Sequence, residues 1–311
     1  MQRVYHTPMV ITNEQLLSRR SAIGSSDMAA ILGLDPYRTP HAVWLEKTGR
    51  VEPEPSSQKA MIGTILEPSI LKLVSEEIGR PIVPVHDPFA KGILKAHLDG
   101  MVDKAAFGQP IVEAKSSGLV DGWGEAGSDE IPDKVMVQVH HQMICSDSHE
   151  AFVGALLAKH GFTFSVYRIP YNPDLAEVII HEAARFWEHV VQDTVPPEAA
   201  SAIDLPILAR MERESTTIVQ IPADLVLEER RLKAIADAAE KEHQDAKARL
   251  VAALGTSEAG VADGGWSVTY RNVETNRLDS KALQTAYPDL VAQFTKPSSY
   301  RRLSIREKKQ K

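Results

Sequence analysis

The segment from residue 97 to residue 115 constrains the fold of this chain most, because it describes two strands joined by a turn. It reads HLDGMVDKAAFGQPIVEAK, with Asp99 near one end and Glu113 near the other. The β-branched, alternating run at the second end predicts a strand after a short glycine-containing turn. Side chains alternate between the faces of a strand, so Glu113 and Lys115 share a face. A chain reversal at the turn therefore brings Asp99 beside this pair at one edge of a sheet.

Two carboxylates and one ammonium at a sheet edge suit metal-assisted hydrolysis of phosphodiesters. Mg²⁺ prefers oxygen ligands and keeps several waters, and Mn²⁺ can replace it. Asp99 and Glu113 can hold one or two such ions, and the carbonyl of Ala114 can add a ligand. Lys115 can orient or help to deprotonate the attacking water. A surface strand with an ion pair remains the alternative, because these residues recur by chance in many chains.

Four sequence blocks occur in the order found in one nuclease family. They are IGSSDMAAILGL at 23–34, GTILEP at 63–68, LDG with VEAK at 98–100 and 112–115, and QVHHQM at 138–143. With them, the chain from about residue 18 to 170 resembles the YqaJ-type viral recombinases of the lambda exonuclease family, within the PD-(D/E)XK nuclease superfamily. The resemblance implies an α/β fold with a mixed central sheet flanked by helices.

The resemblance also implies roles for residues outside the strand pair. Glu67 of the GTILEP block would face the active site and support a metal, often through water. Arg19 and Ser26 match an arginine and a serine that grip the 5′-phosphate of a DNA end. Arg20 is the alternative to Arg19, because nothing in the sequence fixes the register of that helix. Gln138 matches a glutamine that contacts phosphate or the nucleophilic water.

One position departs from the family pattern. A proline, or serine and proline, usually precedes the aspartate, and the serine helps to bind the end phosphate; here His97 and Leu98 stand in those places. His97 can donate to phosphate as an imidazolium, or this contact is lost. His97 is a poor candidate metal ligand because Mg²⁺ is a hard cation. Asp103 lies on the same expected strand face as Asp99 and is a further candidate acid.

Hydrophobic periodicity predicts the remaining elements. The expected helices cover residues 13–20, 27–32, 41–48, 59–78, 133–145, 174–192, 222–254 and 279–287. The expected strands cover residues 81–85, 92–96, 98–103, 111–115, 150–157, 163–169 and 300–305, with a hairpin at Gly264–Gly265. A serine, Ser25 or Ser26, is expected to cap helix 27–32, and Gly63 to let helix 59–78 approach the sheet closely. Trp123, in the glycine-rich loop after Lys115, is expected to pack.

A Pro-Pro pair near residue 196 predicts a domain boundary. We expect a nuclease domain over 1–200 and an α+β accessory region over 201–311, with a long helix, a hairpin and a basic tail. The net charge is −7, but Thr295–Lys311 holds seven basic residues and one glutamate. A DNA-binding surface is therefore local if present. DNA binding, subunit contact and bracing of the core remain open as roles for this region.

Composition excludes several classes of protein. Cys145 is the single cysteine, which excludes a disulfide, a CxxC zinc site and a four-cysteine iron–sulfur cluster, and we expect it to be a packed thiol. No apolar run approaches the ~20 residues that a membrane span needs. The chain is therefore expected in the cytoplasm, which for a phage protein is that of the host cell.

These observations together predict a Mg²⁺-dependent phage DNA exonuclease that resects the ends of linear double-stranded DNA. The single strands would serve recombination with a single-strand annealing protein. A 5′ to 3′ polarity and a homotrimer are implied by the resemblance alone. A structure-specific endonuclease on the same fold and a catalytically inactive DNA-binding module are the alternatives.

Overall fold

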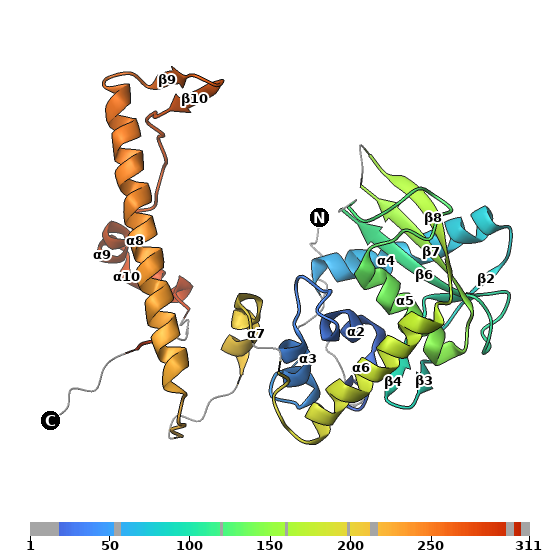
Figure 1. The fold of residues 1–311 in the computed structure, drawn as a ribbon. Helices are drawn as coiled ribbons and strands as arrows, with labels where there is room; N and C mark the ends of the chain where they lie inside the picture. Colours follow the sequence, from blue (N-terminus) through green and yellow to red (C-terminus); the bar gives the residue numbers. More distant parts are fainter. Residues whose placement is uncertain are drawn as a thin grey trace. The chain divides into compact units, whose positions relative to one another are not determined.

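The computed structural model describes residues 19–52, 57–118, 121–158, 161–197, 200–211, 217–296 and 302–305 (Figure 1). The chain forms two compact units, residues 1–213 and 214–311. Of the predicted helix 13–20, only Arg19 and Arg20 lie within the described residues, and both are helical. No helix among the described residues is long and apolar enough to cross a membrane.

A five-stranded sheet forms the centre of the first unit. Its strands are β2 (Ile82–Pro84), β5 (Gly100–Val102), β6 (Ile111–Ser117), β7 (Glu150–Leu157) and β8 (Thr163–Pro170), in the spatial order β2-β5-β6-β7-β8. Strands β6 and β7 run parallel, whereas the other neighbouring pairs are antiparallel. The predicted mixed sheet is therefore confirmed.

The first unit also contains a second sheet of three strands. Its strands are β1 (Ile23–Gly24), β4 (Leu94–Ala96) and β3 (Phe89–Lys91), in the order β1-β4-β3. The sequence predicted neither β1 nor β3. Because β4 belongs to this sheet and β5 to the larger one, residues 97–99 carry the chain from one sheet to the other. Asp99 therefore precedes β5 instead of lying within the predicted strand 98–103.

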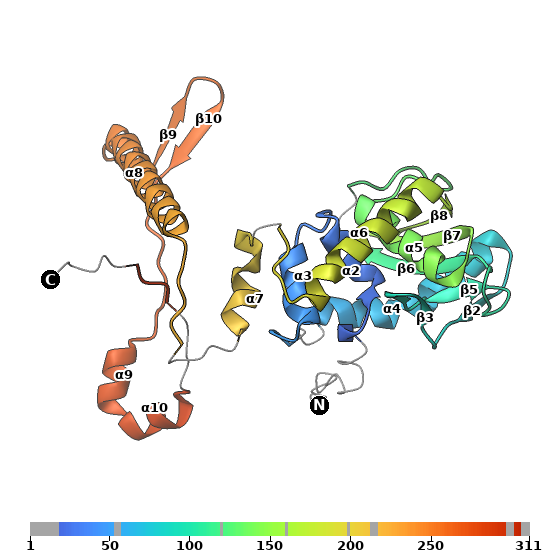
Figure 2. The ribbon, with the colours of Figure 1, turned by 60° about the horizontal axis from the view of Figure 1, so that its bottom comes forward.

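Helices cover both faces of the five-stranded sheet (Figure 1). On one face, α4 (Gln58–Ile78) packs Ile70 and Val74 against Val112 of β6. On the other face, α5 (Asp133–Ser146) packs with α2 (Ser25–Ile31) and α6 (Pro173–Val191), as Figure 2 shows. The α/β class with flanking helices, predicted from the sequence, is thereby confirmed.

The close approach of α4 to the sheet occurs at a glycine other than the one predicted. A Cβ atom at Gly63 would meet no atom within 4 Å, so this glycine permits no close contact. A Cβ atom at Gly154 of β7 would instead lie 2.3 Å from Cγ2 of Val74 and 3.0 Å from Cγ2 of Ile70. Met61, Ile65 and Leu73 of α4 are exposed, so its buried stripe is narrower than its apolar residues alone would indicate.

Helix α2 begins two residues before the predicted start, and its cap differs from the expected one. Gly24 is the N-cap residue, and its backbone N–H donates to Oδ2 of Asp27 at 2.9 Å. Ser25 and Ser26 lie inside the first turn, so the predicted serine cap is wrong. The Asp27 carboxylate takes over because it points back from the third helical position. Helix α3 (Pro40–Lys47) follows, as predicted.

Residues 201–211 pack on the rest of the first unit. They contain a 3₁₀ turn (Ala202–Asp204) and α7 (Leu205–Arg210). Oγ1 of Thr39 donates to Oδ1 of Asp204 at 2.6 Å, and Ile207 is buried in the main core. These contacts extend the first compact unit to residue 213, beyond the boundary predicted at residue 200. The functional division into a nuclease domain and an accessory region stays a prediction.

The described residues of the second unit form one long helix and four short elements. They are α8 (Ala223–Leu254), β9 (Ala259–Ala262), β10 (Trp266–Thr269), α9 (Ser280–Ala286) and α10 (Pro288–Phe294). The predicted hairpin is present, because β9 and β10 pair antiparallel around Gly264 and Gly265, both with positive φ. Helix α10 was not predicted, and residues 302–305, the described part of the predicted last strand, form no strand.

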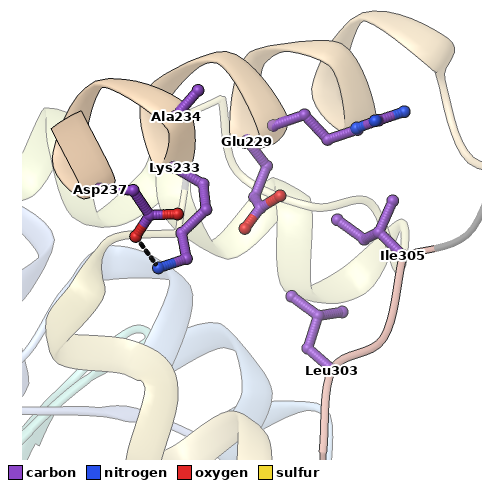
Figure 3. A pocket seen from close by; sticks show the side chains of 7 residues that line it. Glu229, Lys233, Ala234, Asp237, Leu303 and Ile305 are labelled. Carbon is purple, nitrogen blue, oxygen red and sulfur yellow. Dashed lines mark hydrogen bonds and ion pairs between the residues drawn. The ribbon is translucent and has the colours of Figure 1, made fainter.

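Helix α8 carries no buried residue along its described length. Leu303 and Ile305 face a pocket on α8 that Glu229, Lys233 and Asp237 also line (Figure 3). Lys233 forms an ion pair with Asp237 one turn further along the helix. Arg230 also lines the pocket, so its two acidic and two basic residues balance in charge.

Candidate active site

The structure places Asp99 beside Glu113, as the strand–turn–strand pattern predicts. Strands β5 and β6 are antiparallel with Gly100 opposite Val112, so the residues just before and just after these positions also face each other. The backbone N–H of Ala114 donates to Oδ2 of Asp99 at 2.8 Å. Oδ1 of Asp99 accepts no hydrogen bond from any described residue. One oxygen of Asp99 is thus fixed on β6 and the other can bind a ligand.

Glu113 is buried, with 3% of its surface exposed, and its carboxylate lies in a network of donors. Lys115, two residues along the same strand face, donates to Oε1 of Glu113. Nε2 of Gln138 on α5 donates to the same oxygen at 2.6 Å, and Nζ of Lys115 donates to Oε1 of Gln138 at 2.9 Å. Glu113, Lys115 and Gln138 therefore form a closed triangle of hydrogen bonds between β6 and α5.

Negative charge exceeds positive charge in this site. Burial, followed by the charge of Glu113, raises the pKa of Asp99 to about 8. Burial and the charge of Glu113 also raise the pKa of Glu67 on α4. Three carboxylates thus accompany one ammonium, that of Lys115, in a partly buried space. A divalent cation would remove this repulsion, and the oxygen donors are those that Mg²⁺ and Mn²⁺ prefer.

The fit of a metal rests on the pair Asp99 and Glu113. Within the described parts of the chain, no three side chains of His, Cys, Asp or Glu form a group that could hold a metal ion. Backbone oxygen, such as the carbonyl of Ala114, and water would complete the coordination. Glu67 as a metal ligand stays a prediction. Asp103 lies outside the site, because it adopts a positive φ after β5 and pairs with Arg80 at 2.5 Å.

A second cluster of polar groups surrounds His97, two residues before Asp99. Burial lowers the pKa of His97, and the positive charges of Lys95 and Arg19 lower it further, so these groups lie near one another. The free protein therefore favours the neutral imidazole, which can still donate one N–H. Ser26 is exposed two residues after Gly24, which pairs with Lys95 in the β1–β4 register.

The two candidate arginines differ in their contacts. Nη2 of Arg20 pairs with Glu52 at 2.7 Å, and its guanidinium packs against Gly49. The carbonyl of Arg19 accepts from Nζ of the buried Lys47 at 2.7 Å, which fixes its backbone and leaves its exposed side chain near His97. This geometry favours Arg19 as the phosphate-binding residue, and its role stays a prediction.

Sequence reasoning missed one residue of the site. Gln142 lies one turn beyond Gln138 on α5 and donates to Oε2 of Glu113 at 2.6 Å. The spacing of two glutamines on an apolar helix face was the signal that could have found it. Two other predictions are confirmed: Trp123 packs against Tyr167, and Cys145 is buried, which raises the pKa of its thiol to about 12.

Comparison with known proteins supports the predicted resemblance. Residues 15–149 match the YqaJ-like viral recombinase domain. The chain is 27% identical over 315 residues to the uncharacterized protein YqaJ of Bacillus subtilis strain 168, covering 95% of this chain and 94% of that protein. The resemblance to the YqaJ-type viral recombinases is thereby confirmed.

Solved structures of exonucleases are also similar to this chain. An alkaline exonuclease from Laribacter hongkongensis has a TM-score of 0.46 and 16% identity, covering 58% of this chain and 94% of that one. A phage-related exonuclease from Haemophilus somnus 129PT has a TM-score of 0.38 and 12% identity, covering 55% of this chain and 96% of that one.

Proposed function

We propose, from the match of residues 15–149 to the YqaJ-like viral recombinase domain, that this protein is a metal-dependent deoxyribonuclease acting on the ends of linear double-stranded DNA. The observation that carries the proposal is the meeting of Asp99, Glu113 and Lys115 where β5 and β6 pair. A surface strand with a solvated ion pair would leave Glu113 exposed, whereas its carboxylate is buried among donors. Burying a carboxylate costs free energy, and such buried, interacting charges are concentrated at functional sites.

Asp99 and Glu113 would hold Mg²⁺ or Mn²⁺, with the carbonyl of Ala114 as a further ligand and Glu67 as a support. When bound, the metal polarises the scissile phosphate and lowers the pKa of a bound water. The chain supplies the arrangement around it. The N–H of Ala114 holds Asp99, and the ammonium of Lys115 has three N–H donors, of which Glu113 and Gln138 engage two. The third donor is available to the attacking water or to a phosphate oxygen.

Arg19, Ser26 and His97 would bind the phosphate at the DNA end. The guanidinium of Arg19 can pair with two phosphate oxygens at once, and the Ser26 hydroxyl and His97 imidazole can each add one hydrogen bond. Gln138 holds Lys115 in the free protein, so a direct contact of Gln138 with phosphate would require it to exchange partners. These residues would select the end of the DNA, and the acidic pair would cut it.

The product would be single-stranded DNA for recombination with a single-strand annealing protein. A 5′ to 3′ polarity, a homotrimeric assembly and a place in the cytoplasm of a phage-infected host are parts of the same proposal. Their support is the family resemblance of residues 15–149. The region after residue 213 is included in the similarity to the Bacillus subtilis protein, which covers 95% of this chain.

Digestion of linear duplex DNA with 5′-phosphate ends, beside a relaxed closed circle, tests this proposal. The proteins to compare are the wild type, Lys115→Ala and the control Lys233→Ala, whose lysine is exposed on α8. We expect the wild type and the control to degrade only the linear DNA in Mg²⁺, and EDTA or Lys115→Ala to abolish the reaction. Cutting of the circle would instead indicate an endonuclease. DNA binding without any cutting would overturn the catalytic proposal.

A further inference from the structure

Gln142 connects the two acidic elements of the site through a single amide group. It lies on α5 with 1% of its surface exposed. Its Nε2 donates to Oε2 of Glu113 at 2.6 Å and to the backbone carbonyl of His97 at 3.2 Å. Glu113 belongs to β6, whereas His97 begins the crossing segment that ends at Asp99. One side chain therefore ties Glu113 to the segment that carries Asp99.

The orientation of this amide is fixed by the chemistry of its partners. A carboxylate oxygen and a backbone carbonyl only accept hydrogen bonds, so the nitrogen of Gln142 has to face both of them. Its Oε1 is buried and has no hydrogen-bond partner among the described residues. A buried acceptor without a partner costs free energy and is uncommon in folded proteins. The structure therefore keeps the two hydrogen bonds of Nε2 although Oε1 is left without a partner.

The two glutamines of α5 donate to different oxygens of the Glu113 carboxylate. Gln138 donates to Oε1 and Gln142 to Oε2, and their i,i+4 spacing places both on the same face of the helix. A carboxylate that is held at both oxygens cannot rotate about its terminal bond. Oε1 also accepts from Lys115, so the lone pair that remains is on Oε2. It points in a fixed direction, which is the requirement for a preorganised ligand.

We propose that Gln142 is a positioning residue that holds the Glu113 carboxylate, together with the backbone before Asp99, in the arrangement that binds the metal. This inference rests on the proposed function of the Asp99–Glu113 pair. It assigns no contact between Gln142 and the DNA. Loss of the amide should weaken metal binding, and it should lower kcat by a larger factor than it raises the KM for DNA. Of the three residues proposed to bind the end phosphate, only His97 lies in the segment that Gln142 holds.

The test compares Gln142→Met with Ile144→Ala. Methionine keeps the length of the side chain and removes both the donor and the unpartnered oxygen. Ile144 is buried on α5, about 200° around the helix from Gln142 at 100° per residue, so its truncation disturbs the same helix on the opposite side. Mg²⁺ and Mn²⁺ binding to the full-length proteins is measured by calorimetry, thermal unfolding in EDTA, and kcat and KM on linear DNA.

For Gln142→Met we expect metal binding about tenfold to a hundredfold weaker, the range typical when a partner of a metal ligand is removed. Ile144→Ala should lower the Tm and leave the metal affinity unchanged. Metal binding by Gln142→Met as tight as that of the wild type would overturn the inference. So would an equal loss of affinity in Ile144→Ala, because the effect would then follow stability alone.

A double-mutant cycle separates this inference from the proposed function. Gln142→Met, Glu113→Met and the double variant are unfolded with denaturant in EDTA, so the readout needs neither metal nor DNA. We expect the two substitutions to be non-additive, because each removes the same hydrogen bond. Non-additivity in a protein that cuts no DNA would refute the proposed nuclease and keep Gln142 as the residue that holds Glu113. Additivity would overturn the inference even if the wild type proves to be a nuclease.

Discussion

The backbone N–H of Ala114 donates to Oδ2 of Asp99 at 2.8 Å. This hydrogen bond attaches the carboxylate of Asp99, which lies in the segment between β4 and β5, to strand β6. This single hydrogen bond holds the carboxylate of Asp99 beside that of Glu113, which carries the same charge. The bond stabilises the ionised form of Asp99, whereas burial and the charge of Glu113 oppose it more strongly. The site is therefore arranged for a cation at some expense to the stability of the metal-free protein.

Asp99→Asn should stabilise the metal-free protein and abolish its activity. Asparagine removes one of three like charges and keeps an oxygen that can accept from Ala114. Thermal unfolding in EDTA, at a pH above the pKa of Asp99, about 8, should show a higher Tm, with a gain of about 1 kcal/mol or more. DNA cleavage in Mg²⁺ should fall by about a hundredfold or more.

Asp103→Asn is the control, because Asp103 is exposed and pairs with Arg80. This substitution should leave cleavage unchanged. A lower Tm for Asp99→Asn would show that repulsion between Asp99 and Glu113 does not destabilise the metal-free protein.

Arg19→Ala should remove the preference for a phosphorylated DNA end, and Arg20→Ala should not. A charge-assisted hydrogen bond contributes about 1.5–3 kcal/mol, so the ratio of cleavage rates on 5′-phosphate and 5′-hydroxyl ends should fall by roughly tenfold to a hundredfold. Arg20 pairs with Glu52 at the surface, and its loss should cost about 1 kcal/mol or less in stability. The reverse outcome would assign the end phosphate to Arg20.

Acidification should destabilise the protein through His141. Burial lowers the pKa of its imidazole to about 4 from the ordinary value of 6.5. The unfolded chain therefore binds the proton first, and stability falls as the pH drops from 6.5 towards 4. At the end of this range the loss amounts to roughly 3 kcal/mol.

His141→Gln should flatten this part of the pH–stability curve, measured by denaturant unfolding at each pH. Asp27, whose pKa is lowered by Arg38 and Lys47 against the effect of its burial, adds a further loss only at more acidic pH. His243→Gln on the exposed face of α8 is the control and should leave the curve unchanged. An unaltered slope in His141→Gln would show that other groups bind the protons.

Gly154→Ala and Gly63→Ala should change stability in opposite directions. A methyl group at Gly154 would meet Val74 at 2.3 Å, so overpacking should cost about 1–3 kcal/mol. Gly63 lies inside α4 with open space around it, and alanine there should gain about 1 kcal/mol through helix propensity. Denaturant unfolding measures both. A stabilised Gly154→Ala would mean that α4 moves away from the sheet freely.

Local pattern was sufficient for most of the elements near the site. The alternation of Ile111–Lys115 placed Glu113 and Lys115 on one face, because side-chain direction in a strand depends only on the backbone. The turn before it brought Asp99 opposite, since antiparallel neighbours are set by a short connection. Helices α4 and α5 followed from periodicity with ends within one residue of the predicted ones.

Long-range packing decided what the local pattern left open. Strand β1 pairs with β4, about 70 residues later in the chain, so no local signal could show that Asp99 sits between two sheets. Met61 and Ile65 have the i,i+4 spacing of an apolar helix face, yet they are exposed because the sheet meets only the C-terminal half of α4. The proposal of Arg19 over Arg20 as the phosphate-binding residue likewise rests on the ion pair of Arg20 with Glu52, which lies on another segment.

The sequence by itself thus determined the α/β class, the acidic pair with its lysine and the family resemblance, because all three reside in short segments whose geometry is local. Only the tertiary structure decided how the buried Glu113 is held. Its donors come from α5, and whether a helix presents Gln138 and Gln142 to a strand depends on how the two elements pack. A buried charge has to find its partners across such a contact, and no single segment encodes both sides of it.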